Sequence, residues 1–223
     1  MKFVITHQES YSRGQHLLRS MFGMFYIALP HFFVMFFLQI GLMFVNIGRF
    51  WIILFTGKWP KGMFDYAVKL QRYGIRVNAR MSNLCDGYPE FGLNGKDDRT
   101  DFDIEYKETY SRGRMIGRAL FGVLLLIPHF FVLFFKQFAL MFVQMIAWFA
   151  VLFTGKYPTG MFNFVVGVMR HSLRLNNYLY FLVDGYPSFS NGPADGEITE
   201  MHNAFNSTNM GHTNPDILDM KSH

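Results

Sequence analysis

The sequence predicts an all-α membrane protein built as a tandem repeat, and three observations lead to this fold class. First, the chain matches itself at a shift of 98: PHFFV at residues 30–34 returns at residues 128–132, and LFTGKWP at residues 54–60 returns as LFTGKYP at residues 152–158. Second, 51% of the 223 residues are hydrophobic, and they concentrate in one long run per copy. Third, an amphipathic segment with helical period follows each run.

Each unit is expected to begin with a short strand. Residues 2–7 (KFVITH) and residues 101–106 (DFDIEY) alternate between apolar and polar side chains and include β-branched residues. The two strands occupy equivalent places in the two copies, so they can pair as a ribbon across a pseudo-twofold axis. A two-stranded ribbon on its own is marginally stable, which predicts that this one rests on the helices.

A long apolar block follows in each unit. The readily ionised side chains within the two blocks, residues 17–55 and 119–153, are Arg19, His31, Arg49, His129 and Lys136. A helix of about 40 residues is roughly 60 Å long, which is twice a hydrocarbon core of about 30 Å. The blocks are therefore expected to fold as Pro-kinked helical hairpins or re-entrant segments, with tips near residues 38–41 and 136–139. A single long, Pro-kinked helix in each unit is the alternative.

Each block ends in a turn that suits a membrane–water boundary. Lys58 and Trp59 in the first unit, like Lys156 and Tyr157 in the second, directly precede a helix-breaking proline. Basic and amphipathic aromatic side chains collect at such boundaries. The amphipathic helix that follows is expected to lie at the interface and to contact lipid headgroups. Its basic residues in the two units are Lys61, Lys69, Arg72, Arg76, Arg80, Arg170 and Arg174.

These elements divide the chain into four parts. They are a first membrane unit at residues 1–91, a polar linker with the start of the second unit at residues 92–109, a second membrane unit at residues 110–189, and a polar, flexible tail at residues 190–223. Both units keep basic residues at matching places, and Lys and Arg set orientation in a membrane. We therefore expect parallel copies in a bacterial inner membrane, with the polar segments on the cytoplasmic side.

Two histidines and two cations inside the blocks are candidate site residues. His31 and His129 each follow a proline at equivalent positions. Each imidazole is expected to satisfy a backbone carbonyl that the proline frees; the alternative is that the pair ligates haem iron or another metal. Arg49 and Lys136 have no counterpart in the other copy. They are expected to snorkel, Arg49 to the near interface and Lys136 to the far one, or to contact a partner subunit.

The ordered motifs resemble a bacterial membrane-protein family known only as a domain of unknown function. The motifs are PHFFV, LFTGKYPxGMF, an RxxxR helix and DGYPxF, over roughly residues 11–91 and 110–189. The resemblance implies an integral membrane protein of bacterial origin, with no catalytic residues to carry over. Trp59 replaces the tyrosine of the pattern, and the second basic helix carries fewer charges, which leaves room for the copies to differ in role.

The sequence favours a non-enzymatic protein, a structural or accessory subunit of a larger membrane complex. It contains no general acid–base pair, phosphate-binding loop or zinc spacing. No metal or other cofactor is expected, and bound phospholipid is; the expected partners are membrane lipids and membrane-protein subunits, not nucleic acid. The alternatives are a protein that binds or handles a lipid or hydrophobic small molecule, and a haem or metal redox subunit.

Overall fold

A computed structural model describes residues 1–193, which are mostly helical. Most of the predicted tail, from residue 194 onward, lies outside the described residues. In chain order the elements are β1 (Lys2–Ile5), α1 (Arg13–Gly23), the π-helical turn η1 (Met24–Ala28), α2 (Leu29–Thr56), α3 (Lys61–Met81), β2 (Thr100–Asp103), α4 (Arg112–Thr154) and α5 (Thr159–Leu179). All of these elements belong to one compact region, residues 1–191, which contains both sequence repeats.

Each apolar block is one continuous helix. Together α1, η1 and α2 form a helix of 44 residues, Arg13–Thr56, and α4 has 43 residues. The predicted hairpin is therefore wrong, and the alternative of one long helix in each unit is correct. Gly41, near the expected tip, does not turn the chain. It leaves room for Tyr66 of α3, whose hydroxyl donates to the Leu38 carbonyl at 2.7 Å and would lie 2.6 Å from a Cβ at residue 41.

Local sequence signals set the ends of the long helices. Ser12 and Ser111 are the N-caps, and each side chain accepts a hydrogen bond from the backbone N–H three residues later. Gly57 and Gly155 are the C-caps, with φ of 73° and 70°. This left-handed conformation favours glycine, which has no Cβ. The same caps therefore stand at matching places in the two halves of the chain.

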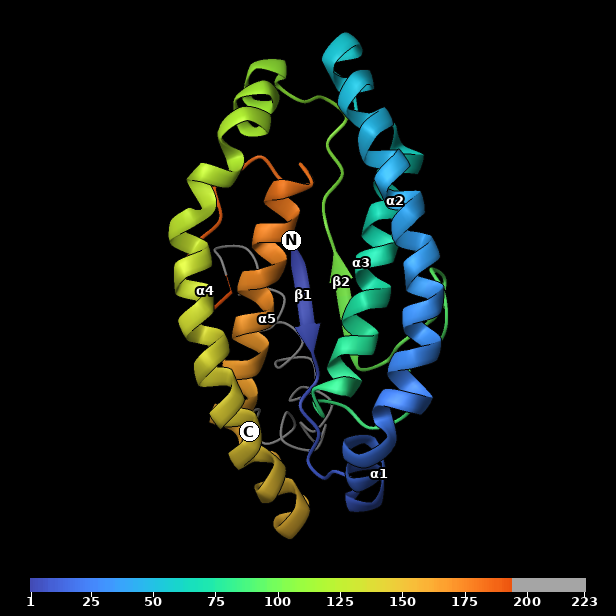
Figure 1. Ribbon diagram of the computed structural model, residues 1–223, viewed down its shortest axis with the longest axis vertical. Helices are drawn as coiled ribbons and strands as arrows, with labels where there is room; N and C mark the ends of the chain where they lie inside the picture. Colours follow the sequence, from blue (N-terminus) through green and yellow to red (C-terminus); the bar gives the residue numbers. More distant parts are fainter. Residues whose placement is uncertain (194–223) are drawn as a thin grey trace, which may run out of the picture. The chain divides into compact units, whose positions relative to one another are not determined.

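The two long helices run antiparallel and meet near both ends (Figure 1). At one end, Trp148 of α4 donates to the Ser20 hydroxyl of α1 at 2.7 Å. At the other end, Arg112 at the start of α4 donates to the Phe55 carbonyl of α2 at 2.9 Å. The shorter helix α3 packs against α2, and α5 packs against α4. The long helices thus form a frame in front of the two shorter helices.

The predicted ribbon is confirmed: β1 and β2 pair antiparallel, with Phe3 opposite Phe102. Both phenylalanines are buried, at 3% and 0% exposed. Arg72 of α3 donates to the Phe102 carbonyl at 2.9 Å, and Arg170 of α5 donates to the Phe3 carbonyl at 3.3 Å. Each strand is therefore held by one of the shorter helices, as expected for a ribbon that is marginal alone.

Candidate functional site

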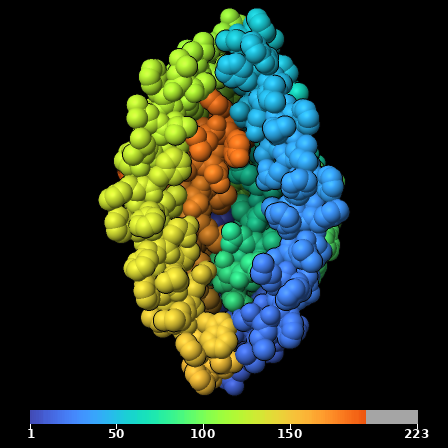
Figure 2. All heavy atoms as spheres, in the orientation of Figure 1, coloured from blue at the N-terminus to red at the C-terminus, as the bar shows by residue number. Residues whose placement is uncertain are grey.

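The outward surfaces of the long helices form an apolar face, which Figure 2 shows as two ridges with a hollow between them. We define it as the exposed side chains of residues 17–55 and 116–153. All of them are uncharged, and the polar ones are Ser20, Gln39 and Gln137. Phenylalanine is the commonest large side chain on it. In each helix only 17% of the most apolar window is buried, so neither resembles the core helix of a soluble protein. Both are long and apolar enough to cross a membrane.

Arginines within these helices turn away from the apolar face. Arg19 is 5% exposed and donates to the Asp86 carboxylate at 2.9 Å. Arg118, at the equivalent place in the second copy, is 8% exposed and donates to the Val183 and Asp184 carbonyls at 2.8 and 3.0 Å. Each guanidinium fastens the DGYP loop of its own unit to the long helix. Buried charges need such partners because their desolvation is costly.

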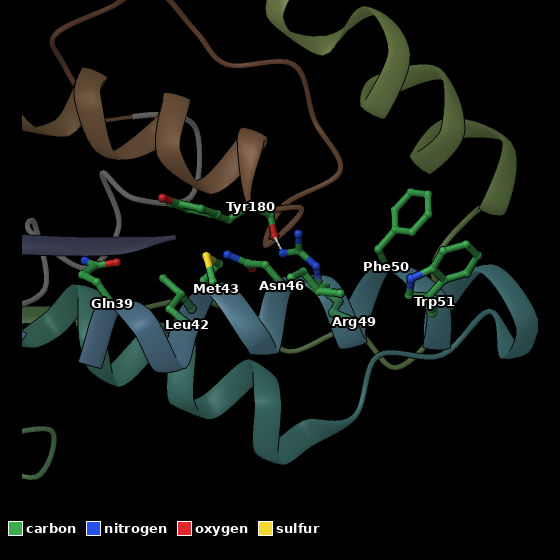
Figure 3. Close-up of a pocket in the computed structure, with 9 residues that line it drawn as sticks. Gln39, Leu42, Met43, Asn46, Arg49, Phe50, Trp51 and Tyr180 are labelled. Carbon is green, nitrogen blue, oxygen red and sulfur yellow. Dashed lines mark hydrogen bonds between the residues drawn. The ribbon is translucent and has the colours of Figure 1, made fainter. Parts of the chain in front are cut away.

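Arg49 bridges the two units instead of snorkelling to an interface. Figure 3 shows its guanidinium pointing from α2 to the end of α5, where it donates to the Tyr180 carbonyl. It also lies 5.1 Å from the ring centroids of both Trp59 and Phe181, a cation–π arrangement. With 6% of its surface exposed, Arg49 is buried within this chain, so the snorkelling prediction is wrong.

His31 lies in an aromatic cage. Its ring stacks on Phe91 with centroids 4.0 Å apart, and its Nδ1 is 2.6 Å from the Tyr73 hydroxyl. The hydrogen-bond partner is therefore a side chain of α3, and the prediction that His31 satisfies a backbone carbonyl is wrong. The other ring nitrogen, Nε2, is buried and has no hydrogen-bond partner in the part of the chain that the structure describes.

His129 lies in an equivalent aromatic cage, but its hydrogen-bond partners differ from those of His31. It stacks on Phe189 at 3.7 Å, and its Nδ1 is 3.0 Å from Nε2 of His171. Lys136, in the middle of α4, lies 2.8 Å from Nδ1 of His171 and donates to the Phe189 carbonyl at 2.8 Å. A lysine ammonium only donates, so His171 accepts at Nδ1 and donates from Nε2 to His129. The predictions that Lys136 snorkels from a hairpin tip and that His129 satisfies a carbonyl are wrong.

The two histidines do not form one ligand set. His31 contacts α3 and the loop after it, whereas His129 contacts α5 and the loop after that. Among residues 1–193 no group of three or more His, Cys, Asp or Glu side chains could hold a metal ion. The geometry therefore offers each imidazole an aromatic cage and not a shared metal centre.

Two basic pairs of the predicted interfacial helices are buried. Arg76 and Arg80 of α3 are 1% and 5% exposed. Arg76 donates to the Gly92 and Gly95 carbonyls at 2.6 Å, and Arg80 pairs with Asp97. In α5, Arg170 and Arg174 are likewise buried and donate to carbonyls of the loop that follows. The expectation that these four arginines face lipid headgroups is wrong, because the segment after each helix folds back onto the basic stripe. Lys61 is exposed, and Lys69 and Arg72 are half-buried.

The aromatic residues of the two boundary turns are also buried within the protein. Trp59 and Tyr157 are 1% and 3% exposed, so the expectation that they lie at a lipid interface is wrong. They pack in the core because the antiparallel arrangement brings each turn against the other unit. Lys58 and Lys156 are exposed, and Lys58 pairs with Glu108 at 2.8 Å. These two lysines keep the exposure that an interfacial role requires.

A central cleft of about 530 Å³ opens between the two long helices and is floored by α3 and α5. In Figure 2 it is the hollow between the two ridges of the apolar face. Among residues 1–193, no charged residue lines it. Its polar side chains, all neutral, are Gln39, Gln71, Asn78, Ser82, Gln137, Gln144, Ser172, Asn176 and Tyr180. A second pocket of about 640 Å³, shown in Figure 3, shares Gln39, Leu42 and Tyr180 with the cleft and reaches Arg49.

The amides of this cleft were not among the sequence candidates. A signal for them exists, because Gln39 and Gln137, like Asn78 and Asn176, match at the shift of 98. The first pair interrupts the apolar runs, but a polar residue in an apolar helix does not reveal that the facing helices carry amides as well. Only the packing of four helices brings these side chains to one cavity.

Comparison with known proteins adds a family match for part of the chain. Residues 118–191 match the family model described as Domain of unknown function (DUF4389). This segment contains most of α4, all of α5 and the loop that carries Phe189. No curated protein and no solved structure matches the chain.

We expect Lys136→Leu to raise the pKa of His171. The pKa of His171 is lowered to about 4, mostly by burial and next by the positive charge of Lys136. Leucine is the residue at the equivalent place in the first unit, Leu38, so the helix tolerates it. A histidine ring-proton titration by NMR measures the change, with the exposed Lys107→Leu as control. An unchanged pKa in Lys136→Leu would show that the ammonium does not face this imidazole.

We expect Asp97→Asn to cost about 3–5 kcal/mol of unfolding free energy, because it strands a buried Arg80 guanidinium. Both side chains are nearly inaccessible, at 6% and 3%. Burial alone would raise the pKa of Asp97, but hydrogen bonds from Arg80 and Thr100 outweigh it and hold the pKa below its ordinary value of 3.8.

The sign of the pH dependence follows from that shift. A carboxyl whose pKa is depressed on folding stabilises the protein above its unfolded pKa, and this stability is lost as the pH falls through the folded pKa. The midpoint of unfolding in detergent, measured from pH 6 down to pH 3, should therefore fall more steeply in the parent than in Asp97→Asn. The exposed Asp98→Asn is the control. Parallel curves for parent and Asp97→Asn would contradict the ion-pair account.

Proposed function

We propose that the protein is a duplicated membrane protein that enters the bilayer from one side, with both long helices lying close to the membrane plane. The observation that carries this proposal is the length of the apolar face. Residues 17–55 extend for about 57 Å at 1.5 Å per residue, against a hydrocarbon core of about 30 Å. A spanning helix would have to tilt by about 60° to bury it, whereas helices in structures tilt by about 20°, up to about 40°.

The symmetry of the ribbon supports the same placement. Lys2 pairs with Asp103, and Val4 pairs with Asp101. At the shift of 99, Lys2 is equivalent to Asp101 and Val4 to Asp103, so a twofold operation exchanges the two pairs and passes through the Phe3–Phe102 pair. Such an axis is perpendicular to the ribbon and runs along the viewing direction of Figure 1. It is therefore roughly perpendicular to the two long helices, which Figure 1 shows along their length. With the apolar face in the membrane, this axis is the membrane normal.

This orientation resolves how two units can keep their basic residues at matching places. A twofold axis along the membrane normal leaves both units with the same sidedness, so Lys58 and Lys156 lie on one side. Helices that spanned the bilayer would place the axis in the membrane plane and put these lysines on opposite sides. One-sided placement agrees with the distribution of Lys and Arg that orients membrane proteins, and we propose the cytoplasmic side of a bacterial inner membrane.

The role that we infer is non-enzymatic: a lipid-bound platform, suited to an accessory subunit of a membrane assembly. The arginines of the long helices fasten loops or the facing unit, as Arg19, Arg118 and Arg49 do, and so support structure. The apolar face carries phenylalanine and methionine, which pack adaptably against acyl chains or partner helices. The exposed ion pairs Lys2–Asp101 and Lys58–Glu108 lie outside the apolar face, on parts of the protein that we place in water.

We expect Lys58→Cys and Lys156→Cys to react with a membrane-impermeant maleimide from the same, cytoplasmic side. Each is introduced singly with Cys85→Ala, because Cys85 is the only other cysteine. Labelling is compared between inverted and right-side-out vesicles, and Lys107→Cys in the exposed linker is the control. Both positions should label in inverted vesicles. Labelling of the two positions from opposite sides would replace this proposal with a spanning, inverted arrangement.

A further inference from the structure

We propose that the central cleft binds a lipid whose headgroup is uncharged and bears hydroxyl groups, such as a glycosyl diacylglycerol. The inference rests on the proposed placement of the apolar face in the membrane, since the cleft opens on that face (Figure 2). The neutral polar side chains that line the cleft determine this class of ligand. Three properties of the cleft support it: unpartnered amides, absence of charge, and position.

The first property is hydrogen-bonding capacity that the described chain leaves unused. Ser82 donates to Asn78 at 2.9 Å, and Ser172 donates to the Val168 carbonyl at 3.1 Å. Five other amides of the cleft make no side-chain hydrogen bond with residues 1–193, and one of their oxygens, Oε1 of Gln71, is buried. These five are Gln39, Gln71, Gln137, Gln144 and Asn176.

Amide and hydroxyl groups can each both donate and accept hydrogen bonds, so they can pair with one another. A sugar or glycerol group supplies such hydroxyls. In a membrane-facing cavity the acyl chains of surrounding lipids offer neither donor nor acceptor. A polyhydroxylated headgroup could pair with several amides at once, which acyl chains alone could not do.

The second property excludes a charged headgroup. Phosphate is recognised by Arg, Lys or helix N-termini, and none of the described residues that line the cleft is charged. Arg49 lines the adjoining pocket, and its guanidinium is already held by the Tyr180 carbonyl and by the rings of Trp59 and Phe181. A phosphate would therefore lose its water without gaining a cation, whereas a neutral headgroup loses less.

The third property is the position of the cleft. Its volume of about 530 Å³ lies within the usual range of ligand pockets, about 300–1,000 Å³. The amides lie between the two apolar ridges, with Met35 and Leu42 of α2 on one wall and Leu140 of α4 on the other. A lipid seated there would place its headgroup among the amides and its acyl chains along the exposed phenylalanines.

Native mass spectrometry of the full chain, released from nanodiscs that contain equal amounts of each lipid, tests this assignment. The probes are monoglucosyl diacylglycerol, diacylglycerol, phosphatidylethanolamine and phosphatidylglycerol with identical acyl chains. We expect at least tenfold more retained glucosyl lipid than phosphatidylglycerol, and at least tenfold less of it in Gln39→Leu/Gln137→Leu. Asn94→Leu, an exposed amide on the linker, should retain as much as the parent. Preferred retention of diacylglycerol over the glucosyl lipid would narrow the ligand to a glyceride and still support an uncharged hydroxyl headgroup.

Equal retention of all four lipids, preference for phosphatidylglycerol, or retention of none by a membrane-bound parent would overturn the assignment. Ser172→Ala/Asn176→Ala, on the floor of the cleft, provides a second variant if the glutamine pair fails to fold; it should also lose the lipid. The same preparations are tested for binding to vesicles. Failure of the chain to bind vesicles would count against the proposed function, whereas vesicle binding without selective lipid retention would count against the cleft alone.

Discussion

The constraint on which the rest of this structure depends is the burial of two apolar stripes, each nearly twice as long as the hydrocarbon core is thick. Helices of this length cannot be covered by α3 and α5, which have 21 residues each. The long helices instead contact each other at both ends and leave their outer surface exposed. The remaining contacts keep that surface free of charge: Arg19, Arg49 and Arg118 point inward, and the exposed lysines lie beyond the ends of the stripes. The fold is best understood as a way of presenting one wide apolar face.

Buried arginines hold the loops and the two units in place. Arg19 and Arg118 are equivalent and fasten equivalent loops, while Arg49 is present in one copy only and joins α2 to the end of α5. Because a buried guanidinium without partners would be strongly destabilising, each one specifies which loop must pack where. The copies also differ in the histidine cages, where Tyr73 faces His31 but His171 faces His129, and Lys136 takes the place of Leu38. Lys136 therefore places an ammonium 2.8 Å from His171 in the second cage, whereas the equivalent residue in the first copy, Leu38, is uncharged.

Much of the fold could be predicted from the sequence, because its signals are local. The serines before each long helix, the glycine after it and the alternating strands specify elements whose hydrogen bonds lie within a few residues or between matching segments. The hairpin prediction was wrong because one glycine near the expected tip is too weak a turn signal to interrupt a long apolar helix. Exposure of Arg76 and Arg80 was predicted wrongly because their partners, the carbonyls and Asp97 of the linker, belong to another segment. The cleft amides lie on four helices and become a site only through packing.

The depth of α4 in a lipid bilayer tests the central claim most directly. Nitroxide labels would be attached at single cysteines replacing Phe121, Phe131, Phe142 and Phe153, which are exposed along the helix at 56%, 65%, 44% and 72%, with Cys85→Ala as background. Electron paramagnetic resonance with oxygen and a water-soluble relaxation agent then reports the depth of each label. A helix in the membrane plane predicts similar depths at all four positions, within one leaflet. A steady change from one headgroup region through the bilayer centre to the other would contradict it and show that α4 spans the membrane.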